Sequence, residues 1–252
     1  MFDLKIQNIH YHLNPTYVAT SFSSALSDLR SGNIPGVFEK RTTYGADIVA
    51  LLIDDTSFCG LANIGPGIDR MFSVTAWNCA TGYYSFGHEI GHNLGLLHDR
   101  GTSSACGTVG YNFGYRDPAA NFRTILAYNC VSGQCDGNAG GGCTRIKRFS
   151  TPLYTYTGQP LGTTGDDNAR AINDVRVEVA GYYPHVSAPS GGNTFTSLPV
   201  GTASNAPVTF FIPFEGYAGG QPSSAIITDV ETRGDFSWSG EYLELRVSTI
   251  PH

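Results

Sequence analysis

Two histidines four residues apart, His88 and His92, lie in the stretch HEIGHNLGLLHD, which covers residues 88 to 99. On an α-helix such residues share one face about one turn apart, so both imidazoles can bind one metal ion at about 2.0–2.1 Å. Glu89 flanks the first histidine, where its carboxylate can accept a proton from a water that the metal activates. The short motif HExxH also arises by chance on solvated helix faces. The residues that follow it are therefore needed to distinguish a metal site from a solvated helix face.

A third histidine, His98, is the candidate for a third ligand. It follows His88 by ten residues, which is about 15 Å along a continuous helix and too far to share one ion. The chain must therefore turn sharply between His92 and His98, and Gly95 lies in that gap. Glycine adopts a left-handed backbone without a Cβ clash, so it can end the helix and turn the chain back. Three imidazoles with one position left open are typical of catalytic zinc.

Hydrophobic patterns around this motif predict the elements that position it. Runs of apolar residues predict buried strands, strict alternation predicts a half-buried strand, and recurrence at helical spacing predicts helices. The expected strands are residues 4–12, 46–53 and 71–77, and the expected helices are residues 21–32, ended by Gly32, then 83–96 and 166–183. Strands interspersed with helices indicate an α/β (α+β) domain with a mixed, twisted sheet.

Two regions depart from this pattern. Residues 99–165 are rich in Gly, Asn, Thr and Cys with little periodicity, which predicts a loop-rich lower subdomain. Residues 184–193 have the composition of a linker, and beyond them only short strands are indicated. We therefore expect a catalytic domain over residues 1–185, followed over residues 186–252 by a linker and a small all-β accessory unit, which could be a truncated sandwich.

The cysteines indicate the compartment. Their even number, in a chain with few lysines and many Gly, Ser, Thr and Tyr residues, is typical of a secreted protein with disulfides, and reduced core cysteines are the alternative. No CxxC pair exists, which argues against a structural zinc knuckle. If neighbours in sequence pair, the bonds are Cys59–Cys79, Cys106–Cys130 and Cys135–Cys143, one of the fifteen connectivities that six cysteines allow.

The charge of the chain limits its partners. A net charge of −6, with 15 Lys and Arg and no basic run, argues against binding nucleic acid through its phosphates. No apolar run is long enough to cross a bilayer, so we expect no membrane partner. Asp54–Asp55 and Asp166–Asp167 could bind calcium, but no EF-hand pattern is present, and Asp166 or Asp167 also suits a helix N-cap. We expect a monomer.

The whole stretch from His88 to Asp99 resembles the long zinc-binding signature of the metzincin metallopeptidases. The trailing Asp99 is similar to the version found in reprolysin-like (adamalysin-type) members. The segments ADIVALLI and CATGYYSFGHE are also similar to those of secreted bacterial reprolysin-like peptidases, and the resemblance covers roughly residues 15–183. It implies a metzincin-like catalytic domain in which His88, His92 and His98 bind one zinc ion and Glu89 is the general base.

The resemblance extends to the turn that metzincins place beneath the zinc. The segment FRTILAYNC, residues 122–130, matches that turn with Leu126 where the family has methionine. That methionine packs under the imidazoles without binding metal, and Met to Leu conserves volume, so we expect the site to survive. Tyr128 stands where a tyrosine reaches the zinc in astacin-, serralysin- and pappalysin-like members. It implies an oxyanion-stabilising residue, and a core tyrosine is the alternative.

These features together predict a secreted zinc endopeptidase that acts on protein or peptide substrates. Glu89 would take the proton of the water and deliver it to the leaving amine. By the resemblance, the substrate would pair with strand 71–77 as an edge strand, and the Leu126 turn and residues 143–152 would wall the pocket for the residue after the scissile bond. The alternative is a catalytically silent zinc module that binds protein or glycan through the C-terminal unit, and the presence of Glu89 argues against it.

Overall fold

The computed structural model describes residues 10–13, 16–183, 198–199, 208–212, 230–233 and 242–247. The chain divides into two compact units: the first comprises residues 1–93 and 176–252, and the second comprises residues 94–175. Within the described part of the chain, no helix has both the length and the apolar character needed to cross a bilayer.

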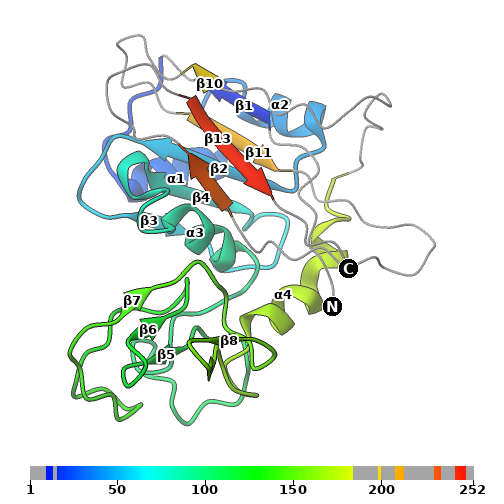
Figure 1. The fold of residues 1–252 in the computed structure, drawn as a ribbon. Coiled ribbons are helices and arrows are strands. Elements are labelled where there is room, and N and C mark those ends of the chain that lie inside the picture. Colours follow the sequence, from blue (N-terminus) through cyan, green and yellow to red (C-terminus); the bar gives the residue numbers. More distant parts are fainter. Residues whose placement is uncertain are drawn as a thin grey trace. The chain divides into compact units, whose positions relative to one another are not determined.

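The first unit contains a five-stranded mixed sheet (Figure 1). Its central pair, β2 and β4, is parallel, and the other neighbours are antiparallel. This confirms the mixed sheet with interspersed helices that the sequence predicts. In spatial order the strands are β1 (His10–Leu13), β11 (Val208–Ile212), β2 (Ile48–Ile53), β4 (Phe72–Ala76) and β3 (Gly60–Ala62).

The two strands predicted as buried are the centre of this sheet. Every residue of β2 and of β4 is buried, as expected for strands covered on both faces. Helix α1 (Phe22–Ser31) packs its apolar face into the same core, with a capping box at Ser21 and a left-handed Gly32 that ends it as predicted. The first predicted strand is described only from His10 onward, because residues 4–9 lie outside the described part.

The expectation that strand 71–77 forms the sheet edge is wrong. In the structure β4 lies between β2 and the three-residue strand β3, and β3 is the edge. A disulfide joins Cys59, just before β3, to Cys79, just after β4, and the amide of Ala76 donates to the carbonyl of Cys59 at 3.0 Å. These contacts hold a short, glycine-containing segment against β4. A segment of that length shows no alternation by which the sequence could predict a strand.

The end of helix α3 (Ser85–Asn93) is attached to the sheet by one buried side chain. The amide nitrogen of Asn93 donates to the carbonyl oxygens of Asn63, Arg70 and Phe72 at 2.9–3.0 Å. In addition, the amide of Gly65 donates to the carbonyl of His92 at 2.9 Å. These hydrogen bonds therefore fix the position of the last turn of α3 relative to the start of β4.

The second unit has little regular structure, as predicted for residues 99–165. It contains a sheet of three short strands, a hairpin whose two strands have two residues each, and the start of the last helix. The predicted helix over 166–183 is present as α4. The elements are β5 (Arg116–Asp117), β6 (Phe122–Arg123), β7 (Thr144–Arg145), β8 (Thr155–Tyr156), β9 (Gln159–Pro160) and α4 (Asn168–Val179).

All six cysteines form disulfides, but two of the predicted pairs are wrong. Cys59–Cys79 is confirmed, whereas the other bonds are Cys106–Cys135 and Cys130–Cys143, in place of Cys106–Cys130 and Cys135–Cys143. The side-chain oxygen of Asn129 accepts from the amides of both Cys130 and Cys143, which brings these two segments together. In the second unit, each cysteine therefore pairs with one that is not next to it in the predicted pairing. The parallel pairing of β7 with β6 brings the segment of Cys143 back to that of Cys130.

Five further elements are present in the described part of the chain. Helix α2 (Val37–Tyr44) and the 3-10 turn η1 (Trp77–Cys79) lie in the first unit and were not predicted. Strands β10 (Leu198–Pro199), β12 (Val230–Arg233) and β13 (Tyr242–Val247) form a separate antiparallel sheet, while β11 joins the main sheet. The linker at 184–193 lies outside the described residues, so the predicted domain division at residue 185 stays a prediction.

We predict that Asn93→Ala lowers the free energy of unfolding by about 2–4 kcal/mol, because buried carbonyl oxygens lose their donor. Urea unfolding followed by tryptophan fluorescence would measure it. Asn33→Ala, at an exposed asparagine, should change stability by less than about 0.5 kcal/mol. Equal effects of the two substitutions would contradict the anchoring role of Asn93.

Candidate metal centre

Helix α3 carries two of the predicted ligands and the predicted base on one buried surface. His88, Glu89 and His92 are all buried. The helix ends at Asn93, earlier than the predicted residue 96, and Gly95 beyond it has a left-handed φ of 85°. The carbonyl of Gly95 accepts a hydrogen bond from the side chain of Asn112 at 2.7 Å, which fixes the turn. The chain thus leaves the helix at the position that the spacing of the histidines requires.

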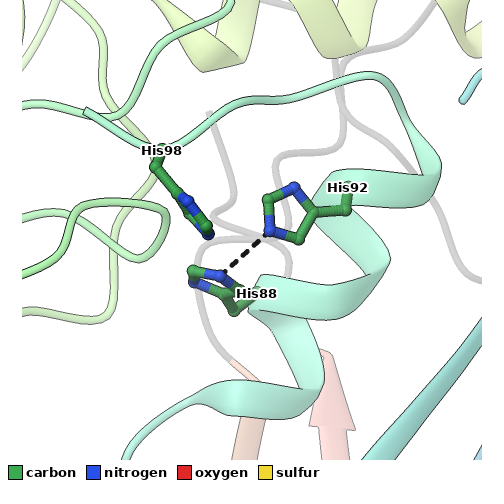
Figure 2. A group of neighbouring side chains, drawn as sticks. All are labelled: His88, His92 and His98. Carbon is green, nitrogen blue, oxygen red and sulfur yellow. Dashed lines mark hydrogen bonds between the residues drawn. The ribbon is translucent and has the colours of Figure 1, made fainter. Parts of the chain in front are cut away.

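The three histidines come together (Figure 2). Their ligand atoms all lie within 4.8 Å of one another, and the Nε2 atoms of His88 and His92 are 3.1 Å apart. Tetrahedral zinc with Zn–N bonds of about 2.0–2.1 Å places its nitrogen ligands about 3.3 Å apart. The imidazoles therefore fit a zinc ion with small adjustments of their side chains. Among the described residues this triad is the group that could hold a metal.

Strand β3 leaves space for the carboxylate of Glu89. If Gly60 had a Cβ atom, it would overlap the side-chain carboxylate of Glu89. Gly60 is not in a left-handed conformation, so glycine is required here for space alone. Sequence reasoning missed this residue, because the contact joins strand β3 to a helix that follows it by more than twenty residues.

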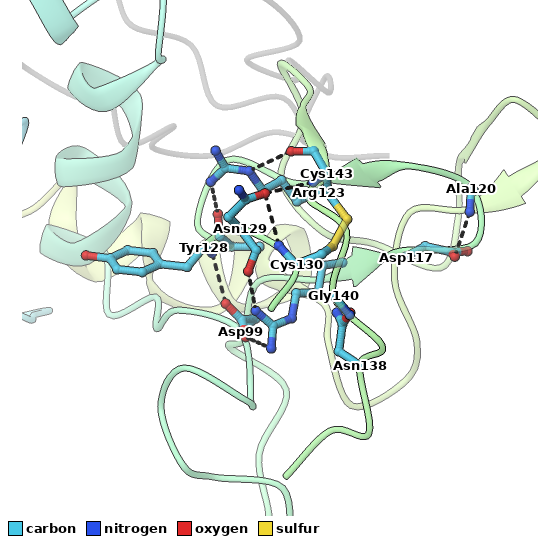
Figure 3. Close-up of a disulfide and its surroundings, with 12 residues drawn as sticks. Asp99, Asp117, Ala120, Arg123, Tyr128, Asn129, Cys130, Asn138, Gly140 and Cys143 are labelled. Carbon is cyan, nitrogen blue, oxygen red and sulfur yellow. Dashed lines mark hydrogen bonds and ion pairs between the residues drawn. A yellow bond between two sulfur atoms is a disulfide. The ribbon is translucent and has the colours of Figure 1, made fainter. Parts of the chain in front are cut away.

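Tyr128 is placed next to the third histidine. The centroid of its ring lies 4.3 Å from that of His98, and 48% of the tyrosine is exposed. The alternative interpretation as a core tyrosine is therefore wrong. The backbone amide of Tyr128 donates to Oδ2 of Asp99 at 2.9 Å (Figure 3). Asp99 directly follows His98, so this bond holds Tyr128 next to the histidine that its ring contacts.

Asp99 belongs to a buried ionic network. Its Oδ1 accepts from the amide of Thr102 at 2.9 Å and lies 3.2 Å from Nη2 of Arg116. The same arginine pairs with Asp136 at 2.7 Å and donates to the carbonyl of Asn129 at 2.7 Å. A buried carboxylate is stable as an anion only when such partners satisfy it. The network fixes the backbone on both sides of Tyr128.

Leu126, predicted beneath the imidazoles, is completely buried in the second unit. Gly114 packs against it so closely that an added Cβ would lie 3.0 Å from that of Leu126. Gly114 and the backbone of the Leu126 turn are therefore in close contact. Its position under the histidine rings stays a prediction.

The carboxylates predicted as candidate calcium ligands all accept hydrogen bonds from the protein itself. The pairs are Asp54 with the indole of Trp77, Asp55 with the amide of Ser57, Asp166 with the guanidinium of Arg100, and Asp167 with the amide of Arg170. Asp167 thereby caps the start of α4, as the sequence predicted for Asp166 or Asp167. Burial raises the pKa of Asp167, and the amide of Arg170 partly opposes that rise.

Comparison with known proteins gives matches to peptidases. Residues 2–99 match metallo-peptidase family M12B, reprolysin-like. The peptidyl-Asp metalloendopeptidase of Stenotrophomonas maltophilia is 35% identical over 187 residues, which cover 71% of this chain and 43% of that protein. Proteins of the same name from Xanthomonas campestris pv. campestris (33% identity; 71% and 42% covered) and Pseudomonas fragi (38%; 44% and 66%) are also similar. The chain spans less than half the length of the first two relatives.

The family match contains the whole of helix α3 and ends at Asp99, so it includes all three histidines. The curated relatives extend the similarity well beyond this match along the chain. The resemblance drawn from HEIGHNLGLLHD is thereby confirmed. The chain belongs to the reprolysin-like metallopeptidases of family M12B.

Proposed function

We propose that the chain is the catalytic part of a secreted zinc endopeptidase. One observation carries the proposal: three imidazoles converge within 4.8 Å, and a buried glutamate follows the first of them on the same helix. The names of the relatives, which are metalloendopeptidases, support it.

His88, His92 and His98 would hold the zinc ion through one ring nitrogen each. Three neutral nitrogen ligands with an open fourth position are the donor set of catalytic zinc. When bound, zinc supplies Lewis-acid polarisation of a carbonyl and lowers the pKa of water at the open position. The buried positions of His88 and His92 keep bulk water away from two of the three ligands.

Glu89 would act as the general base and then as the general acid. Its carboxylate is buried, and the bare backbone of Gly60 leaves room for it beside β3. A carboxylate held there can accept a proton from water and donate it to the leaving amine. Tyr128, exposed and in contact with the His98 ring, would donate a hydrogen bond from its hydroxyl to the developing oxyanion.

The substrate would bind as an extended strand along β3, not along β4. An edge strand has unpaired backbone groups that can pair with a peptide, and β3 is the edge beside Glu89. Because the relatives are peptidyl-Asp metalloendopeptidases, we further propose that this chain cleaves peptide bonds next to aspartate.

Secretion is supported by the disulfides. All six cysteines form three disulfides, and such bonds are typical of oxidising compartments and rare in the cytosol. We also propose that the enzyme acts as a monomer and that residues 186–252 form an accessory unit, of which strand β11 pairs with the main sheet.

We predict that Glu89→Ala retains bound zinc but lowers the rate of peptide hydrolysis by a factor of about 10²–10⁴, which is the usual contribution of a general base. Zinc content by atomic absorption and casein cleavage would be measured on the same samples. Stoichiometric zinc without cleavage in the parent chain would favour the silent zinc module instead.

We predict that His98→Ala weakens zinc binding by more than about a hundredfold, because loss of a residue that only hydrogen-bonds to a metal ligand already costs about 10–100-fold. Competition with a chromogenic chelator would measure the affinity. His10→Ala, at a histidine of β1, is the control and should bind zinc as the parent does. Unchanged zinc affinity of His98→Ala would remove His98 from the ligand set.

We predict that Gly60→Ala lowers kcat by about ten- to a hundredfold with unchanged zinc content, because the added Cβ displaces the Glu89 carboxylate and small misplacements of catalytic groups are costly. Gly82→Ala is the matched control, since nothing lies within 4 Å of a Cβ there. Full activity of Gly60→Ala would mean that Glu89 acts from another rotamer.

A further inference from the structure

The backbone of strand β3 shows which of its residues can pair with a further strand. Just after β3, the amide of Asn63 donates to a β4 carbonyl at 3.2 Å, and just before it, the carbonyl of Cys59 accepts from a β4 amide at 3.0 Å. In an antiparallel pair, every second residue directs both backbone groups at the neighbouring strand, and the residues between them direct theirs away. Gly60 and Ala62 therefore direct their backbone groups at the open edge of the sheet.

The side chains of β3 alternate between the two faces of the sheet. Gly60 faces helix α3, because a Cβ atom on it would overlap the carboxylate of Glu89. Leu61 is the register partner of Val74, which belongs to the core that helix α1 completes. Register partners place their side chains on the same face, so Leu61 lies on the α1 side. A peptide that pairs with β3 therefore meets bare backbone on one face and a leucine on the other.

Leu61 and Phe58 form an exposed apolar surface at this edge, which we call the β3 patch. The exposed fractions are 37% for Leu61 and 67% for Phe58. The ring of Phe58 packs edge-on against Phe22 of helix α1, with 6.0 Å between the ring centroids, so it lies on the same side of the sheet as Leu61. An open strand edge with apolar side chains beside it favours the addition of another strand.

Two occupants fit such an edge, an extended peptide or a second copy of the chain. The strand has only three residues, and very short edge strands are a common means by which proteins avoid pairing with their own copies. The carboxylate of Glu89, the proposed general base, lies beside Gly60, the residue before Leu61. The patch is therefore continuous with the place where the substrate backbone is proposed to pair, and the substrate is the occupant that these contacts favour.

We propose that the β3 patch, Phe58 and Leu61, is a specificity-determining subsite that binds an apolar side chain of the substrate. This inference rests on the proposed function, in which the peptide pairs with β3, and it adds a preference at a position other than the aspartate. Side chains alternate along an extended peptide, so one residue lies against the patch and its two neighbours point to the other face. The competing explanation is that a second copy of the chain covers the patch.

The test uses peptides that contain one aspartate and differ only in the position of a single leucine. Serine occupies the other positions on both sides of the scissile bond, which mass spectrometry of the products would assign. Leu61→Thr removes most of the apolar side chain and keeps a residue that favours strands. Ile68→Thr is the matched control, since Ile68 is also exposed, at 47%, and lies in the same segment but outside β3. Leu61→Arg replaces the apolar side chain by a charge.

We expect leucine at one position to raise kcat/KM of the parent about tenfold over serine, as burial of most of one leucine side chain does. Leu61→Thr should lose most of this gain without slowing the peptide that lacks leucine, and Ile68→Thr should keep it. Leu61→Arg should prefer glutamate at the same position. If Leu61→Thr does not fold, Phe58→Ser, at the more exposed residue, takes its place.

Three kinetic results would overturn the proposal. They are a parent without a gain at any position, a gain that survives Leu61→Thr, and an equal slowing of every peptide by that variant. Sedimentation velocity tests the second copy, and we expect the parent and Leu61→Arg to sediment alike as monomers. A parent dimer that Leu61→Arg dissociates would overturn the proposal, because a second copy then covers the patch.

Binding separates this inference from the proposed function. Fluorescence anisotropy of the same peptides would be measured on the zinc-loaded Glu89→Ala chain with and without Leu61→Thr. A preference for leucine at one position that disappears with Leu61→Thr supports the inference even if the parent cleaves nothing, in which case only the proposed function fails. Equal binding of all the peptides by Glu89→Ala would overturn the inference, whatever the parent cleaves.

Discussion

The separation of His98 from the other two histidines is the constraint on which the rest of the site depends. Along a continuous helix, His98 would be about 15 Å from His88, yet the three ligand atoms lie within 4.8 Å of one another. The chain must therefore leave helix α3 at one defined residue. Asn93 fixes the last turn of the helix through three backbone carbonyls, and Gly95 supplies the left-handed residue just beyond it. A helix that ended one turn later would move His98 out of reach.

Asp99 links the position of His98 to the backbone of the second unit. It follows His98 directly, and its carboxylate holds both the amide of Tyr128 and the guanidinium of Arg116. Charge-assisted hydrogen bonds of this kind are short and directional, so the backbone at Tyr128 has little freedom to move relative to His98. The disulfide Cys130–Cys143 closes the loop after Tyr128. A region almost without regular secondary structure thus acquires a defined geometry from ionic and covalent contacts.

The sequence predicted those parts of the fold that depend on local spacing. The motif from His88 to Asp99, the buried strands β2 and β4, and helix α1 all follow from periodicity or from the reach of side chains. The failures concern contacts between distant segments. Strand β3 has three residues and is defined by its pairing with β4, and the partner of Cys106 depends on how the loop before β7 returns. The space that Gly60 leaves for Glu89 likewise exists only in three dimensions.

The same division applies to the proposed chemistry. Three of the four groups that would bind zinc and move the proton, His88, Glu89 and His92, come from a single helix, and His98 follows it closely, so a sequence pattern is enough to find them. The surroundings of these groups depend instead on contacts between distant segments. The bare backbone of Gly60 on strand β3 leaves room for the Glu89 carboxylate, and Asp99 holds the amide of Tyr128. No spacing within one segment predicts either contact, so the ligands can be found from the sequence while the groups around them require the structure.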